Sequence, residues 1–255
     1  MKRGMNRMGS STVTAVTIYG NNADCDSLDV VGALSTAPTA IIAADELQIQ
    51  SGGNVADIYS GAGAREVTVV GLNSSWDVIS EVIQTKGAAA SAQTTQQFIR
   101  LNAAWVNYSG TVNAANTGAI VIENAAGTDL GTIPAGAGNL SQAFYTIPDG
   151  YTGYVASFDV TSTAGDKFIG VFTRTADDVT TPFPGIRARM VRPGFDGYTH
   201  LLNPIEARAR TDVWLGVVTG VDLQPCSAAA EIYLVPDVSP TPAAPTPIPS
   251  PTPTP

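Results

Sequence analysis

The chain has few of the residues on which most enzyme and metal sites depend. It holds a single histidine, His200, and only two cysteines, Cys25 and Cys226. A nucleophilic site of the Ser-His-Asp or Cys-His type would have to use His200, and the sequence has no Gly-x-Ser-x-Gly elbow. Zinc sites need clusters of Cys and His, which the sequence lacks. We therefore expect no catalytic residue and no metal, and two partly buried free thiols unless a single bridge joins them.

Positive charge is also scarce. Lys and Arg number 13 against 22 Asp and Glu, which gives a net charge of −9 and a pI near 4.4. Binding to nucleic acid depends on clustered cations, so we expect none. The sequence has no run of about 18 apolar residues that would cross a membrane. Its N-terminal segment lacks the apolar core of a secretory signal. These features predict a protein made in a cytoplasm, with no membrane partner.

Acidic and glycine-rich clusters are present but lack the spacing of known sites. Pairs such as Asp177-Asp178, or Asp77 with Glu81, would hydrolyse glycosides only if they faced each other across a cleft. The oxygen-rich run 21–29 misses the glycine and the closing glutamate of an EF-hand loop. The glycine-rich stretches lack the lysine of a phosphate-binding loop. We expect no cofactor, and we expect that the protein is not an enzyme.

Turn residues and alternating apolar residues are what the chain does have. Glycine (25) and proline (17) are plentiful. Apolar and polar residues alternate in many short segments, for example Glu46–Gln50 and Tyr151–Val160, which is the pattern of half-buried strands. Roughly a dozen such segments recur at the ~8–12 residue spacing typical of sandwiches and barrels. The sequence predicts an all-β fold, an antiparallel β-sandwich of the jelly-roll or Ig-like kind.

Composition divides the chain into four parts. Residues 1–39 are polar and turn-rich and predict an N-terminal arm. Residues 40–137 and 138–236 predict two sandwich domains, with one larger sandwich as the alternative. Residues 237–255 contain mainly Pro, Thr and Ser, which predicts a polyproline II or disordered tail. We expect this tail to be either a solvated stalk or a docking segment for a neighbour.

A short motif occurs twice near the division between the predicted domains. Thr132-Ile133-Pro134-Ala135-Gly136 is echoed by Thr146-Ile147-Pro148-Asp149-Gly150. Proline followed two residues later by glycine suits a tight turn. We expect each copy to end one strand and begin another.

Arginines concentrate late in the chain. A local basic face could pair with an acidic face of a neighbouring subunit, because arginine suits bidentate pairing at interfaces. The alternative is a scatter of solvated charges, since surface ion pairs contribute little. The candidate interface residues are Arg187, Arg189, Arg192, Arg208 and Arg210.

Several stretches of the chain resemble structural proteins of tailed bacteriophages, many of them from marine viruses. The resemblance covers roughly residues 60–236 and rests on strand and turn patterns. It implies a virion component and carries over no catalytic residue. The stretches are VTVVGLNSSWDVISEVIQTKG, TTQQFIRLNAAWV, IVIENAAGTDLGTIPAG, YTIPDGYTGYVASFDV, RTADDVTTPF and TDVWLGVV.

Three hypotheses about function follow. The first is a phage virion structural protein, a homo-oligomer that assembles in many copies with other virion proteins, as a capsid decoration or vertex protein or as a tail or fibre component. The second is an adhesin that binds a glycan or receptor on the host surface through exposed aromatic side chains. The third, an enzyme acting on polysaccharide, would need two acids across a cleft.

Overall fold

The computed structural model describes residues 12–25, 29–31, 43–52, 55–111, 115–162, 167–175, 187–193, 197–219 and 224–237. Within these ranges every regular element is a β-strand, and all strand pairs are antiparallel. The predicted all-β fold is confirmed. The strands are β1 (Thr14–Cys25), β2 (Asp29–Val30), β3 (Leu47–Ser51), β4 (Ala64–Leu72), β5 (Val78–Gln84), β6 (Arg100–Ser109), β7 (Ile120–Asn124), β8 (Asp129–Ile133), β9 (Phe144–Thr146), β10 (Tyr151–Ser162), β11 (Lys167–Thr175), β12 (Arg187–Pro193), β13 (Gly197–Ala207), β14 (Thr211–Thr219) and β15 (Gln224–Pro236).

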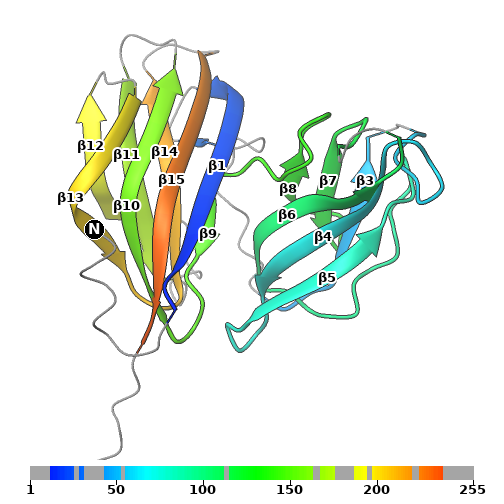
Figure 1. Ribbon diagram of the computed structural model, residues 1–255, viewed down its shortest axis with the longest axis horizontal. Coiled ribbons are helices and arrows are strands. Elements are labelled where there is room, and N and C mark those ends of the chain that lie inside the picture. The colour runs from blue at the N-terminus through cyan, green and yellow to red at the C-terminus, as the bar shows by residue number, and fades with distance from the viewer. Residues whose placement is uncertain are drawn as a thin grey trace, which may run out of the picture.

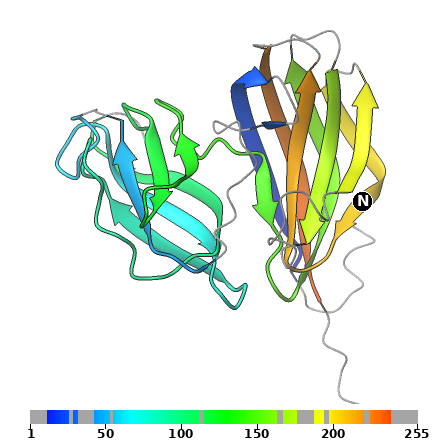
Figure 2. The same cartoon turned by 180° about the vertical axis from the view of Figure 1, so that it is seen from behind.

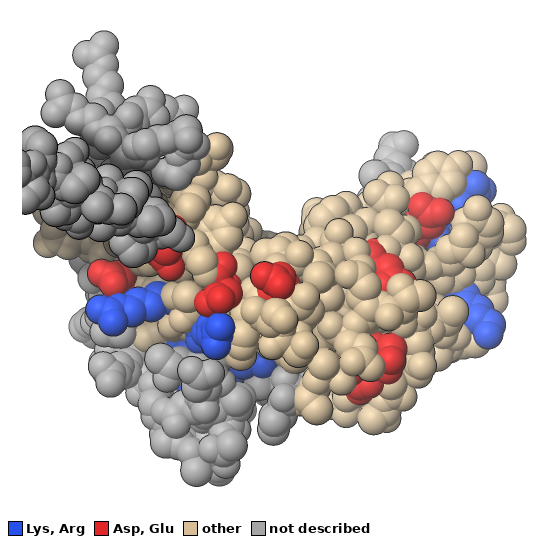
Figure 3. Space-filling view, turned by 90° about the horizontal axis from the view of Figure 1, so that it is seen from below, with Lys and Arg blue, Asp and Glu red and all other residues tan. Residues whose placement is uncertain are grey.

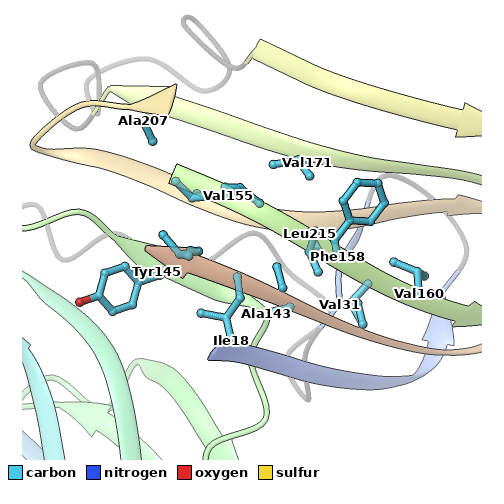
Figure 4. Close-up of a cluster of buried hydrophobic side chains, with 14 of the residues drawn as sticks. Ile18, Val31, Ala143, Tyr145, Val155, Phe158, Val160, Val171, Ala207 and Leu215 are labelled. Atoms are coloured by element: carbon cyan, nitrogen blue, oxygen red, sulfur yellow. The ribbon is translucent and has the colours of Figure 1, made fainter. Parts of the chain in front are cut away.

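The strands form two lobes that lie side by side (Figure 1). One lobe packs a sheet of order β1-β15-β10-β13 against a sheet of order β12-β11-β14-β2, with β9 also paired to β14. The side chains between these two sheets are mostly aliphatic, with Phe158 and Tyr145 as the aromatic members, and Figure 4 shows them in the shared interior. We call this lobe the large sandwich.

The other lobe, which we call the small sandwich, packs the sheet β3-β7-β8 against the sheet β5-β4-β6. Its core is a separate cluster that includes Leu47, Val67, Phe98 and Ile122, all fully or almost fully buried. The buried Asp57 carboxylate accepts hydrogen bonds from the Ser51 hydroxyl and from backbone N–H groups, including that of Ala64. A carboxylate with several donors is well satisfied, so it stabilises the loops of this small lobe.

Strand β1 differs from the expectation of an arm over residues 1–39. It pairs along its length with β15 and belongs to the large sandwich, although it precedes the small sandwich in sequence. Its inward positions include Ile18, Gly20 and Asn22, of which only the first is apolar. A Cβ on Gly20 would lie 1.9 Å from the carbonyl oxygen of Val31, so close packing excludes a larger side chain. Because Gly20 and Asn22 stand at inward positions, the sequence of β1 does not alternate between apolar and polar residues.

Residues 137–143 connect the lobes and are hydrogen-bonded to both (Figure 2). On the small sandwich, Val106 donates to Gly138 and Leu140 donates to Ala104, both at 2.8 Å. On the large sandwich, the Gln142 N–H donates to Tyr19 at 2.7 Å. A connection paired on both sides restricts the motion of one lobe against the other.

The two Ile-Pro turns have closely similar backbone conformations at their glycines. Gly136 and Gly150 both have φ of +73°, a region that residues with a Cβ rarely adopt. The second turn leads from β9 into β10, and the first follows β8 and leads into the connection between the lobes. The rest of the predicted tail beyond Asp237 lies outside the described residues.

Candidate functional site

The most unusual cluster in the described part of the chain is a buried charged network where the lobes meet. Asp212 on β14 is fully buried, and Arg100 on β6 is 3% exposed. The Arg100 Nε donates to Asp212 Oδ1 at 3.1 Å, which links the small sandwich to the large one. Arg174 on β11 donates to Oδ2 at 2.8 Å, and the Thr146 hydroxyl donates to Oδ1 at 2.7 Å. One carboxylate therefore joins three strands of the large sandwich to the small sandwich.

Local strand geometry explains how these residues meet. Thr146, Asp212 and Arg174 are register neighbours on β9, β14 and β11, so they form one row across the sheet. Alternation turns this row away from the aliphatic core, which is filled by their neighbours Val213 and Tyr145. The parallel row Phe144, Trp214 and Phe172 forms its own buried cluster on the same face. The lone acid in an apolar strand is thus placed on the face that the small sandwich covers.

A second contact across the junction is uncharged. The Asn102 side chain on β6 donates to the Thr146 carbonyl oxygen and accepts from the Thr146 N–H, both at 3.0 Å. Asn102 also hydrogen-bonds the hydroxyl of Tyr145. That hydroxyl points from the aliphatic core toward the small sandwich (Figure 4). Burial raises the pKa of Tyr145 to about 12, and the Asn102 contact opposes this only in part.

Trp76, in the turn before β5, forms the outer part of the junction. The guanidinium carbons of Arg100 and Arg210 lie 5.3 and 5.9 Å from the centre of its rings. Its carbonyl oxygen accepts from the Asp149 N–H at 3.1 Å, and Asp149 also pairs with Arg210 at 3.2 Å.

Backbone strain is concentrated at the same place. Among the described residues, Trp76 (φ 66°) and Arg210 (φ 59°) are the two non-glycine residues with positive φ. Such conformations cost energy and persist where surrounding contacts impose them. The two strained turns contact each other, so the junction is held in one specific geometry.

The five arginines of the predicted interface do not share one environment in the structure. Arg208 is 87% exposed beside Glu206, whereas Arg210 is directed at Trp76 of its own chain. Backbone register puts Arg187 near the Thr211 end of the sheet, where these two lie, and Arg192 toward the other end. The side chains of Arg187, Arg189 and Arg192 lie outside the described residues. Basic and acidic side chains are interspersed on the face that Figure 3 shows.

Candidate groups for catalysis and metal binding do not come together in the described residues. His200 is exposed on β13, and no group of three or more His, Cys, Asp and Glu side chains in the described ranges could hold a metal. Glu81 is occupied by hydrogen bonds from Thr95 and Gln96, and Asp77 lies in the turn with Asn73. The pair Asp177-Asp178 falls outside the described ranges.

Three further predictions concern the two cysteines, the oxygen-rich run and membrane-spanning segments. Cys25 and Cys226 are both buried in its core, on neighbouring strands β1 and β15. Most of the oxygen-rich run predicted as a polar turn, Asn21 to Cys25, is the end of β1. No helix in the described part of the chain is long and apolar enough to span a membrane.

Arg100 and Asp212, the buried pair of the junction, were not among the sequence candidates, whereas Arg210 at its outer part was predicted as an interface residue. Arg100 lies in the segment Phe-Ile-Arg-Leu, and Asp212 starts the segment Asp-Val-Trp-Leu. The available signal was one charged residue in each of two apolar strands, because such charges are buried only when paired. Nothing in the sequence identified the two as partners.

Known proteins show only weak similarity to this chain. No family model matches the chain, and no curated protein matches it. Among solved structures, the VP2 subviral particle of infectious bursal disease virus is 12% identical, with a TM-score of 0.20, over 89% of this chain and 72% of that one. A structure of the Gt strain of the same virus has the same identity and coverage and a TM-score of 0.16. These are weak similarities to a viral capsid protein.

Proposed function

We propose that this chain is a structural protein of a virus particle, where it assembles in many copies with itself and with other virion proteins. The resemblance of residues 60–236 to structural proteins of tailed bacteriophages supports the proposal. The proposal covers a capsid decoration or vertex protein and a tail or fibre component, both assembled in the host cytoplasm.

One observation carries the proposal, namely the buried junction around Asp212. The side chains of Arg100 and Arg174, together with Thr146, satisfy the carboxylate where the lobes meet. A charged group buried this way is costly to separate, so it favours one arrangement of the lobes. Repeated assembly needs subunits of constant shape, because each interface recurs at every symmetry-related position. A fixed two-lobed body serves that requirement.

The test is to look for the protein in purified particles. We expect mass spectrometry to find it at a fixed stoichiometry relative to the other virion proteins. The matched solution experiment is analytical ultracentrifugation of the purified protein, in which we expect self-association. A monomer that is absent from particles would overturn the proposal.

A second candidate function is an adhesin for a host-surface glycan. Trp105 is 37% exposed and Tyr108 is 52% exposed on the same strand, and exposed aromatic rings can stack on sugars. Binding to a glycan array that is lost in Trp105→Ala would favour this function. An array without hits would count against it.

A further inference from the structure

The small sandwich presents a mixed face to solvent, on which exposed valine and tryptophan side chains flank the nearly buried Thr68. The sheet β5-β4-β6 turns one side toward its core and the other toward the viewer in Figure 1. Val78 and Val82 on β5 are 54% and 48% exposed, and Trp105 on β6 is 37% exposed. We call this outer side of the three strands the open face.

Register shows that the residues of the open face are contiguous. Thr68 of β4 is opposite Val82 on one side and opposite Trp105 on the other, which makes one row across the sheet. The next row along the sheet contains Val70, between Ser80 and Ala103. Opposed residues in antiparallel strands lie about 4.5–5.5 Å apart, so Val82 and Trp105 lie within about 11 Å of each other.

Charge lies at the two ends of this surface, where Arg100 is opposite Leu72 at one end and Arg65 lies over Tyr108 at the other. The acid at its end, Glu66, accepts a hydrogen bond from the side chain of Asn107 at 3.2 Å. Neither of the two rows contains an ionisable side chain. Contiguous apolar surface of this kind marks a place where another segment binds.

The C-terminal segment begins close to the open face. The Asp237 N–H donates to the Gly150 carbonyl oxygen at 2.8 Å, and the Thr152 hydroxyl donates to the Asp237 carboxylate. The residue before Gly150, Asp149, donates to Trp76 in the turn that starts β5. Val78, the first residue of the open face, follows that turn. Only two hydrogen bonds and a few residues separate the end of the body from the edge of the open face.

Length and composition make residues 238–255 suitable to cover it. An extended polyproline II segment of this size reaches about 55 Å, whereas β5 is about 20 Å long. The segment VSPTPAAPTPIPSPTPTP has no charge, like the two central rows of the open face. Proline-rich segments bind to surfaces lined with aromatic rings, and their fixed φ lowers the entropy cost of binding.

We propose that residues 238–255 bind across the open face of their own chain, with proline rings packed against Trp105 and Val82. The tether at Asp237 raises the effective concentration of the segment to the millimolar range, which favours its own face over that of another copy. The inference does not depend on a role in virus particles.

The test uses 19F-labelled tryptophan in the full chain and in a chain that ends at Asp237. Truncation should shift the Trp105 resonance, which is assigned with Trp105→Phe. The Trp214 resonance, from a buried ring in the other lobe, should not move. A synthetic peptide of residues 238–255, added to the truncated chain, should restore the shift in a saturable way.

Two matched variants make the test specific. Val82→Glu places a charge on the open face, and it should make the Trp105 resonance of the full chain resemble that of the truncated chain. Leu202→Glu places the same charge on β13, where Leu202 is 91% exposed, and it should change nothing. Thermal unfolding of both variants checks that the fold is intact.

Three results would overturn the proposal. One is a Trp105 resonance that is identical with and without the segment. Another is a shift that grows with protein concentration, because the face would then be covered by a second copy. The third is a peptide effect that is unchanged by Val82→Glu, because the contact would then lie elsewhere.

Discussion

The junction and the open face reverse the usual distribution of polar and apolar groups. The junction buries a carboxylate and a guanidinium group, while the open face leaves valine and tryptophan side chains exposed. Breaking a buried ion pair is expensive, whereas an exposed apolar group contributes little to stability. The difference indicates that the junction maintains the shape of the body and that the open face is available for contacts.

The largest expected effect is at the junction. Asp212→Ala leaves Arg100 and Arg174 without their shared carboxylate and should lower the free energy of unfolding by about 3–5 kcal/mol. Asp149→Ala removes a carboxylate that is 46% exposed and should cost less than about 1 kcal/mol. Chemical denaturation of both variants measures the difference. Equal losses would show that burial does not distinguish the two pairs.

Alkaline pH should affect the same region. Burial raises the pKa of Tyr145 from its ordinary value of 10 to about 12 in the folded protein, so the stability it contributes is complete below pH 10. It is then lost as pH rises through 12, by up to about 2.7 kcal/mol. Tyr145→Phe cannot ionise and should show a correspondingly smaller loss between pH 10 and 12 in urea titrations. If the free energy of unfolding fell equally with pH in the wild type and in Tyr145→Phe, ionisation of Tyr145 would not be the cause of the loss.

The open face should tolerate charge. Val82→Glu should change the free energy of unfolding by about 0.5 kcal/mol or less, because the side chain is half exposed in the folded protein. The core variant Ile83→Glu, one residue further along β5, is the matched control and should unfold the small sandwich. A large loss in Val82→Glu would mean that the face is part of a core.

Removal of residues 238–255 should have the smallest effect. Residues 238–255 follow the last described residue, Asp237, and the proposed contact is with an outer face and not with either core, so their deletion should change the Tm of the body very little. Differential scanning calorimetry of the full and truncated chains measures this. A Tm drop comparable to that of Asp212→Ala would place the segment among the stabilising elements.

Much of the fold could be predicted from local patterns. The alternation at Glu46–Gln50 and Tyr151–Val160 corresponds to β3 and β10, and the period of two needs no information from distant residues. Strand β1 was missed because neither Gly20 nor Asn22, at inward positions, is a large apolar residue, and at Gly20 packing against Val31 leaves no room for a Cβ. That requirement comes from a strand contact that the local sequence does not encode.

The junction could not be predicted for a related reason. Arg100 and Asp212 are 112 positions apart, and each is one charged residue in an apolar segment. Their pairing depends on how the two lobes pack, which follows from the connection at residues 137–143. The arginine interface was a prediction from local density, and Arg210 instead contacts Trp76 of its own chain.

In the proposed function, the two sandwiches form one rigid subunit of a virus particle. Cryo-electron microscopy of purified particles, averaged over their symmetry, tests it most directly. We expect repeated two-lobed density into which both sandwiches fit together, with Arg100 next to Asp212. Particles without such density, or density in which the lobes occupy different relative positions from copy to copy, would contradict it.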